Sequence, residues 1–165
     1  MQFSGKAHKF GDDVNTDYII SGKYKFKTLD MKELAKHVME DLDPNFYERV
    51  ADGDFIVAGT NFGCGSSREQ APLAIKFAGV GAVLAKSFAR IFYRNAINTG
   101  LPVVECDTDR IDPGDVLSVD LAAGVITNRT KGTAIAIKPL PEVMIKILND
   151  GGLAAHFKKY GGFNL

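Results

Sequence analysis

The pattern of apolar and polar residues divides most of the chain into two parts of different character. Between residues 55 and 106, three short apolar runs alternate with two segments whose apolar residues recur at helical spacing. The runs cover residues 55–58, 82–85 and 101–106, and the helical segments span residues 70–77 and about 87–99. Short apolar runs joined by helices are typical of parallel strands buried on both faces. This part predicts a parallel α/β layer with right-handed connections.

The last third of the chain has the pattern of an antiparallel sheet. Residues 116–121, 125–128 and 133–137 form short strand-like runs separated by turns. A helix is predicted to begin at Pro139 or Pro141 and to end after Leu148, where an Asn-Asp-Gly-Gly segment follows. A last turn or two of helix is predicted over residues 153–160. The predicted fold is therefore α/β, with a mixed sheet that joins a parallel layer to antiparallel strands.

The N-terminal part is predicted to add one strand and two helices. Apolar and polar residues mix with a period near two over residues 3–10, which indicates a first strand. A helix with Asp30 as its N-cap is predicted to run to about residue 41. Pro44 opens a second short helix that ends near Val50. The apolar face of the first helix is formed by Leu34, Ala35, Val38 and Met39.

Composition and charge exclude several classes of protein. The 165 residues suit one domain, residues 1–165, with room for a hydrophobic core. The 20 basic and 20 acidic residues cancel, so we predict no nucleic acid and no membrane as partner. No apolar run approaches the length of a membrane span, and the N-terminus lacks the apolar region of a secretion signal. We therefore predict a cytoplasmic protein.

The few cysteines and histidines argue against a metal site on this chain. Cys64 and Cys106 cannot form a disulfide framework, and two cysteines are too few for a four-cysteine zinc or iron–sulfur site. His8, His37 and His156 are scattered without the spacing of metal ligands. We predict that this chain binds no metal and that each histidine has a surface or capping role.

The chain is organised around a glycine-rich turn between the first apolar run and the helix after it. Residues 61–69 read Asn-Phe-Gly-Cys-Gly-Ser-Ser-Arg-Glu. Gly63 and Gly65 allow a tight backbone with positive φ. Ser66 or Ser67 is predicted to cap the following helix, whose first amides then face any bound anion. Arg68 adds a fork of donors that suits a carboxylate or a phosphate. These residues predict a turn that holds an anion beside one or two hydroxyl groups.

Other interpretations of this turn have less support. A Walker loop needs Lys followed by Ser or Thr after its glycines, and a nucleophile elbow needs Gly-x-Ser-x-Gly. Cys64 stands between two glycines, but no histidine nearby in the sequence supports a nucleophilic role. The residues alone leave open whether the turn binds a ligand or only connects a strand to a helix.

Two further polar segments have ordinary structural explanations. The aspartates at residues 12, 13 and 17 are typical of turns that satisfy their own backbone, and they lack the glycine and glutamate of a calcium-binding EF-hand loop. Arg90, Arg94 and Asn95 lie on and around the second helix of the parallel layer, where we predict solvated or structural roles.

The glycine-rich turn also carries a resemblance to a known family. Residues 61–71, Asn-Phe-Gly-Cys-Gly-Ser-Ser-Arg-Glu-Gln-Ala, resemble the signature of the aconitase-type swivel domain. In length and overall pattern, from Phe3 to about Gly151, the chain resembles the small-subunit family of 3-isopropylmalate dehydratase. The resemblance implies the swivelling β/β/α fold of the aconitase C-terminal type. It also implies a hydro-lyase of leucine biosynthesis that moves a hydroxyl group between two carbons of a 2-alkylmalate by dehydration and rehydration.

The same resemblance implies roles for individual residues. Ser66 is expected to be the catalytic base, acting as an alkoxide, and Ser67 and Arg68 are expected to hold substrate carboxylates. An alkoxide is chemically demanding, and helix amides together with Arg68 would stabilise it as an oxyanion hole does. Thr16 and Asp17 match a segment that borders the active site in the family. Supporting roles are therefore expected for Thr16, Asp17, Gly63 and Gly65.

The resemblance further implies a partner chain. Enzymes of the family remove hydroxide with a [4Fe–4S] cluster that has one open iron and is held by cysteines of a large subunit. This chain is expected to bind no cofactor and to be active only with that large subunit. Cys64 is then a small residue in a tight turn and not a ligand.

The identity of the substrate stays open at this point. Lys25, Phe26 and Lys27 lie in an alternation of cations and aromatics that matches the loop contacting the variable group of the substrate. Phe26 favours an alkyl group, as in isopropylmalate or 2,3-dimethylmalate, whereas the lysines leave room for the tricarboxylate of a homoaconitase. A hypothesis of another class is a non-catalytic module that binds an anion with the same turn.

Overall fold

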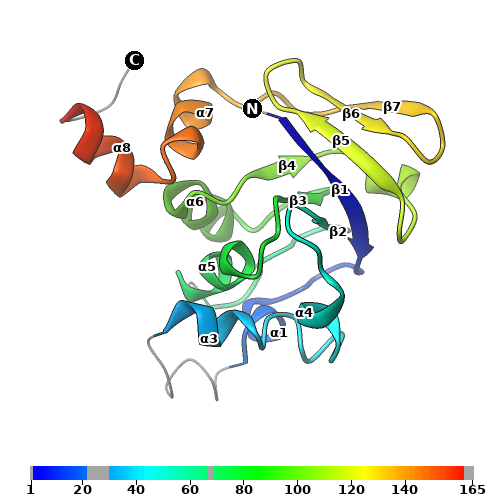
Figure 1. The fold of residues 1–165 in the computed structure, drawn as a ribbon, viewed down its shortest axis with the longest axis horizontal. Helices are drawn as coiled ribbons and strands as arrows, with labels where there is room; N and C mark the ends of the chain where they lie inside the picture. The colour runs from blue at the N-terminus through cyan, green and yellow to red at the C-terminus, as the bar shows by residue number, and fades with distance from the viewer. Residues whose placement is uncertain (1, 22–29, 67–68, 162–165) are drawn as a thin grey trace.

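A mixed sheet of seven strands runs through the molecule in the order β4-β3-β2-β1-β5-β6-β7 (Figure 1). The structure is a computed structural model, and it describes residues 2–21, 30–66 and 69–161. Strands β1 to β4 pair in parallel and strands β5 to β7 pair antiparallel, so the predicted mixed sheet is confirmed. The strands are β1 (Gln2–Lys9), β2 (Phe55–Ala58), β3 (Ala82–Ala85), β4 (Val103–Glu105), β5 (Val116–Asp120), β6 (Val125–Asn128) and β7 (Thr133–Ala136).

The helices pack mainly on one side of the parallel strands. Figure 1 shows α3, α5 and α6 in a row, with the antiparallel strands on the other side of the molecule. Helices α7 and α8 pack against α6 and against each other. The described helices are α1 (Thr16–Ile19), α3 (Met31–Ala35), α4 (Phe46–Arg49), α5 (Gln70–Phe77), α6 (Arg90–Thr99), α7 (Glu142–Asn149), α8 (Leu153–Tyr160) and a 3₁₀ turn, η1 (Thr108–Arg110).

The first strand changes partner along its length. Residues 2–6 of β1 pair antiparallel with β5, whereas residues 7–9 pair in parallel with β2. Gly5 lies next to the change, where a Cβ atom would stand 2.6 Å from the carbonyl oxygen of Gly53. Only a residue without a side chain allows this close approach. β1 therefore joins the parallel and antiparallel halves into one sheet.

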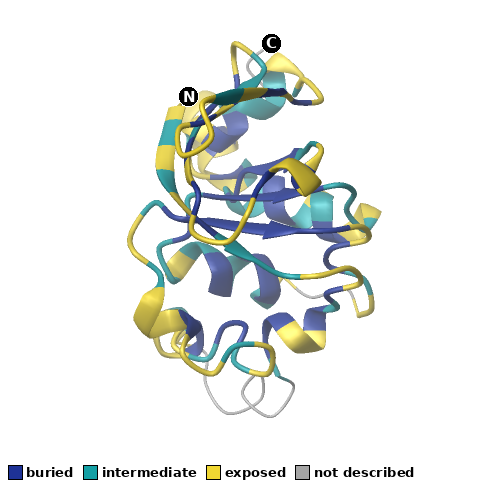
Figure 2. Cartoon of the chain, turned by 90° about the vertical axis from the view of Figure 1, so that its right-hand side faces the viewer, coloured by how far each residue is buried: buried dark blue, intermediate teal, exposed yellow. Residues whose placement is uncertain are grey.

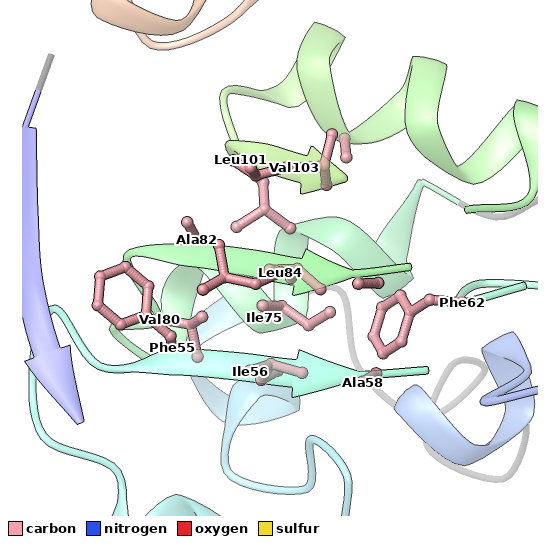
Figure 3. Packing of buried hydrophobic residues seen from close by; sticks show 14 of the residues in the cluster. Phe55, Ile56, Ala58, Phe62, Ile75, Val80, Ala82, Leu84, Leu101 and Val103 are labelled. Carbon is pink, nitrogen blue, oxygen red and sulfur yellow. The ribbon is translucent and has the colours of Figure 1, made fainter. Parts of the chain in front are cut away.

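The hydrophobic core is centred on the parallel strands. Every residue of β2 and β3 is buried, as Figure 2 shows for the strands in the middle of the molecule. Figure 3 shows Ile56 and Leu84 of these strands beside Ile75, which comes from α5. Each of these three side chains is fully buried. Burial on both faces explains why the sequence of these strands is continuously apolar and does not alternate.

One predicted helix is shorter than the sequence pattern indicates. Asp30 caps α3 as predicted, since its side chain accepts a hydrogen bond from the amide of Lys32 at 3.0 Å. The helix ends at Ala35, and a series of turns replaces its predicted second half. Met39 has a positive φ of 59°, and its amide donates to the carbonyl oxygen of Ile19 at 2.8 Å. A contact distant in sequence has therefore taken the place of the helical hydrogen bond.

The predicted serine caps are wrong. The N-cap position of α5 is Glu69 and not Ser66, and Ser67 lies outside the described residues. The N-cap position of α6 is Ala89, which provides no side-chain cap, and Ser87, the serine that precedes this helix, has another partner. Its hydroxyl accepts a hydrogen bond from the amide of Asn61 at 2.8 Å. A serine that precedes a helix has here been used to hold a neighbouring loop.

The surface role predicted for the histidines is wrong for two of them. His156 is fully buried, and its Nδ1 lies 2.8 Å from a carboxylate oxygen of Asp150. The side chain of His8 is 14% exposed, and its Nε2 lies 2.8 Å from a carboxylate oxygen of Asp54. An isolated histidine in a sequence does not reveal such a partner, because each carboxylate comes from a different element.

Within the described residues, no helix combines the length and the apolar character that crossing a membrane requires.

Candidate active site

The glycine-rich turn lies where the parallel strands end, and residues 11–16 run along one side of it. The amide of Thr60 donates to a carboxylate oxygen of Asp12 at 2.8 Å, and the amide of Gly63 donates to the carbonyl oxygen of Val14 at 2.7 Å. Two hydrogen bonds from Thr16 follow. Its amide donates to the carbonyl oxygen of Cys64 at 2.9 Å, and its hydroxyl donates to the carbonyl oxygen of Ser66, also at 2.9 Å.

Residues 86–89 hold the turn on its other side. The amide of Phe62 donates to the carbonyl oxygen of Ser87 at 3.1 Å, and the amide of Ala89 donates to the carbonyl oxygen of Phe62 at 2.9 Å. Figure 3 shows the ring of Phe62 beyond the ends of β2 and β3, where it is fully buried. The turn is therefore an extension of the parallel sheet, held between the segments that follow β1 and β3.

The two turn glycines have different reasons to be glycine. Gly63 has a φ of +83°, and a Cβ atom there would stand 2.2 Å from Cγ of Phe92 in α6. Both the backbone angle and the space therefore require a residue without a side chain. Gly65 has a φ of +94°, but its nearest neighbours would be at ordinary contact distance, the first being Cβ of Asn15 at 3.5 Å. At Gly65 the backbone angle alone favours glycine.

A cavity of about 230 Å³ opens between the turn and the start of α6. One wall comes from the turn and from α1, and the other comes from the first residues of α6 and the residue before them. The lining contains two residues with hydroxyl groups, one amide and one guanidinium, and its described residues include no carboxylate. These residues are Thr16, Gly63, Gly65, Ser66, Ala89, Arg90, Ile91, Phe92 and Asn95. Such a lining suits a small anionic ligand.

The structure brings several of the predicted site residues together. Ser66, Gly63, Gly65 and Thr16 all line this cavity, and Thr16 is buried beneath it. Asp17 follows on α1 and is exposed, and its amide donates to the side chain of Asn15 at 2.8 Å. The substrate-binding residues predicted at 67 and 68, and the predicted substrate loop, lie outside the described residues. They are Ser67, Arg68, Lys25, Phe26 and Lys27.

Two cavity residues were not predicted to belong to the site. The sequence predicts solvated or structural roles for Arg90 and Asn95, yet both line the cavity that contains Ser66. Arg94, interpreted in the same way, does not line it. The order of the predicted strands and helices could have indicated that these residues belong to the site. In parallel sheets ligands bind at the carboxyl ends of the strands, and α6 begins at the carboxyl end of β3, next to the turn.

The described residues contain no group of three or more His, Cys, Asp or Glu side chains that could hold a metal ion. Cys64 and Cys106 are both free thiols. Burial, together with the nearby charge of Asp107, raises the pKa of Cys106 to about 12. Metals bind the thiolate form of cysteine. The residues of this chain therefore do not fit an iron–sulfur cluster.

Comparison with known proteins settles the family. The family described as the aconitase C-terminal domain matches residues 9–108 of the chain. The chain belongs to the aconitase C-terminal domain family. The predicted fold class and the predicted resemblance are thereby confirmed. In this family the chain is similar to proteins named as dehydratase small subunits over its whole length.

Three relatives show how closely the chain matches within the aconitase C-terminal domain family. The small subunit 2 of 3-isopropylmalate dehydratase from Archaeoglobus fulgidus is 62% identical over 165 residues, which is 100% of both chains. The methanogen homoaconitase small subunit from Methanothermobacter thermautotrophicus is 56% identical, over 94% of this chain and 90% of that one. A crystal structure of 3-isopropylmalate dehydratase from Methanocaldococcus jannaschii superposes with a TM-score of 0.94 at 52% identity, covering 98% of this chain and 96% of that one.

These relatives confirm the predicted enzyme class. The chain is a small subunit of the 3-isopropylmalate dehydratase type, a class of hydro-lyase. A small subunit implies a large one, so the prediction of a large-subunit partner is supported by the names of the relatives.

Proposed function

We propose that this chain supplies one half of an active site that interconverts 2-isopropylmalate and 3-isopropylmalate, and that a large subunit supplies the other half. The observation that carries the proposal is the cavity at Ser66. The hydroxyl-bearing residues Ser66 and Thr16, a guanidinium and two glycines line it, and the turn that forms it is held by hydrogen bonds on both sides. A rigid turn keeps the hydroxyl group in one place relative to a bound substrate, which catalysis requires.

Ser66 is the proposed base that takes a proton from the carbon beside a carboxylate. The hydroxyl group must lose its own proton to do so, and an ordinary serine stays protonated near neutral pH. Nearby positive charge and oriented amides lower the cost of the alkoxide. Arg90 lines the same cavity, and Arg68 is two residues from Ser66 in the sequence. In this proposal Ser67 and Arg68 bind substrate carboxylates, as the family resemblance implies.

Removal of hydroxide from the substrate needs a Lewis acid that this chain does not provide. The family resemblance implies a [4Fe–4S] cluster on cysteines of the large subunit, and the two cysteines of this chain do not fit one. We therefore expect the chain alone to be inactive. Thr16 has a positional role in the proposal, because its hydroxyl group fixes the carbonyl oxygen of Ser66.

The variable group of the substrate is assigned to the loop that contains Lys25, Phe26 and Lys27. Phe26 favours an alkyl group, which supports isopropylmalate, with 2,3-dimethylmalate as a close analogue. The relatives include both isopropylmalate dehydratase and homoaconitase small subunits at similar identity. One methyl or methylene group changes selectivity by only about 1–3 kcal/mol, so the alkyl analogues are expected to compete. Steady-state turnover of 2-isopropylmalate, 2,3-dimethylmalate and homoaconitate on one preparation ranks them.

The experiment that tests the proposal combines this chain with a cluster-loaded large subunit under anaerobic conditions. Turnover of 2-isopropylmalate is expected only when both chains are present. Ser66→Ala is expected to abolish turnover and to leave assembly intact. Ser118→Ala is the matched control, because this serine lies in β5, in the antiparallel half, and its hydroxyl group pairs with that of Ser4 at 3.1 Å.

Two results would refute the proposal. Normal turnover by Ser66→Ala would assign the base to another residue. Absence of turnover by the wild-type pair, combined with measurable binding of malate-type anions to this chain, would instead favour the non-catalytic anion-binding module.

A further inference from the structure

Arg90 stands where three hollows of the surface meet. Besides the cavity at Ser66, it lines a hollow of about 510 Å³ that also contains Glu105 and Lys138, and another of about 330 Å³ that contains Arg94. We propose that Arg90 binds one carboxylate of the substrate in the cavity at Ser66 and so orients the carbon that loses its proton. This inference rests on the function proposed above and adds a substrate-binding residue to it.

The charge balance around Arg90 supports this role. Arg90 is exposed, and it forms no ion pair with any residue that the structure describes. The acidic residue that shares a hollow with it, Glu105, lies 3.5 Å from Nζ of Lys138. Among the described residues, no acidic side chain therefore competes with a ligand for the guanidinium of Arg90. Within the cavity at Ser66, Arg90 is the one charged side chain among the described lining residues.

The chemistry of the substrate requires such a residue. A 2-alkylmalate carries two carboxylates, and each gains most from a charge-assisted, two-pronged hydrogen bond of the kind that arginine makes. Arg90 is the first residue of α6, and its neighbour Phe92 packs against Gly63 of the turn. The contact between Phe92 and Gly63 joins α6 to the turn. The backbone of Arg90 is therefore held in place relative to Ser66.

A matched control lies one helical turn away. Arg94 is exposed like Arg90, belongs to the same helix and forms no ion pair with a described residue. It lines the hollow between α6 and α7 but not the cavity at Ser66. Charge on the helix surface is therefore common to both arginines, and contact with the cavity is specific to Arg90.

The test compares Arg90→Ala, Arg90→Lys and Arg94→Ala in the reconstituted enzyme with 2-isopropylmalate. Arg90→Ala is expected to raise KM on the order of 10- to 100-fold, with a smaller change in kcat, because a charge-assisted contact to the bound substrate is lost. Arg90→Lys is expected to recover part of the loss. Arg94→Ala is expected to keep the KM of the wild type. Circular dichroism and the thermal midpoint of each variant show whether it is folded.

Three outcomes overturn the proposal. An unchanged KM in Arg90→Ala means that the residue does not touch the substrate. Weaker assembly with the large subunit, combined with a normal KM once the partner is saturating, means that Arg90 binds a carboxylate of the partner. Equal effects of Arg90→Ala and Arg94→Ala mean a general effect of charge. Failure of the proposed function is distinguishable, because the wild-type enzyme would then show no turnover in the same assay.

Discussion

The two halves of the sheet differ in what their strands cover and in where their polar groups lie. In the parallel half, every residue of β2 and β3 is buried, and polar groups gather beyond the strand ends. In the antiparallel half, buried and more exposed residues alternate along β5, β6 and β7. There the polar groups beside the strands pair with one another. Asn128 donates to Asp115 at 2.8 Å, and Lys131 forms an ion pair with Asp112 at 2.9 Å.

This difference explains why the candidate site belongs to the parallel half. Parallel strands that are covered on both faces leave only their ends open, and the loops at those ends are free to bind a ligand. Antiparallel strands joined by short turns use their loop polar groups to close the turns. The antiparallel half therefore stabilises the sheet, and the parallel half presents the site.

The largest effect is expected for one of two glycines that have the same backbone angle φ but lie in different halves. Gly63 in the parallel half and Gly114 in the antiparallel half both have a φ of +83°, but only Gly63 packs against another side chain. Gly63→Ala is expected to lower the free energy of unfolding by about 3–4 kcal/mol, from the backbone angle and the contact with Phe92 together, and to abolish turnover. Gly114→Ala is expected to cost only about 1 kcal/mol. Urea unfolding measures both, and equal losses would contradict the close packing at Gly63.

A buried side-chain amide in the antiparallel half tests whether that half contributes to stability and not to turnover. Asn128 is fully buried, and its side chain donates to Asp115 and accepts from the amide of Lys131 at 3.2 Å. Asn128→Ala is expected to lower the free energy of unfolding by about 2–3 kcal/mol, because Asp115 and the amide of Lys131 would each lose a hydrogen-bond partner. Turnover below the melting temperature is expected to stay normal. Thr127→Ala, an exposed neighbour on the same strand, is the control. A loss of turnover in Asn128→Ala at full folding would mean that the two halves are not separate in function.

An exposed apolar residue beside the cavity tests which end of the parallel half meets the large subunit. Ile91 is 52% exposed and lines the cavity at Ser66. Ile91→Asp is expected to weaken assembly by about 10-fold or more, because a charge would replace an apolar group that the partner covers. Phe77 is 46% exposed but lies at the end of α5, beside the opposite ends of the parallel strands. Phe77→Asp is expected to assemble normally in titrations followed by calorimetry. The reverse result would place the partner on the other side.

The smallest expected effect concerns acid stability at the junction of the two halves. Burial alone would raise the pKa of Asp54, but hydrogen bonds from His8 and from the amides of Lys6 and Ala51 outweigh it and hold the pKa below its ordinary value of 3.8. The stabilisation is therefore complete above that value and is lost as the pH falls through the lowered pKa. Urea unfolding between about pH 7 and pH 2 is expected to show this decline in the wild type and a weaker decline in Asp54→Asn. Identical profiles would contradict it.

Much of the parallel half could be predicted from the sequence. β2, α5 and β3 have the bounds that the apolar runs and the helical spacing predict, because a strand buried on both faces must be apolar throughout. The turn between β2 and α5 was recognisable from its glycines and its signature. Gly100 ends α6 in the left-handed conformation, as expected for a helix that stops at glycine.

The rest depends on contacts between segments that are distant in sequence. Met39 leaves its helix to bond with Ile19, and Ser87 holds Asn61 instead of capping α6. Arg90 belongs to the cavity at Ser66 only because α6 starts beside the turn. Local patterns cannot indicate these partners, since each depends on which strands become neighbours in the sheet. The two missed site residues and the wrong caps have this common cause.

The position of β1 also has a consequence for how the chain folds. The side chain of Gln2 bonds to that of Asp120, 118 residues later, so the pairing of β1 with β5 closes a very long loop. Such pairings form slowly, since the entropy of loop closure must be lost before the contacts are gained. Strands β2 to β4 can assemble from residues 55–105 before β5 has left the ribosome. We therefore expect a folding intermediate whose parallel strands still have an open edge, which β1 and β5 close in the last step.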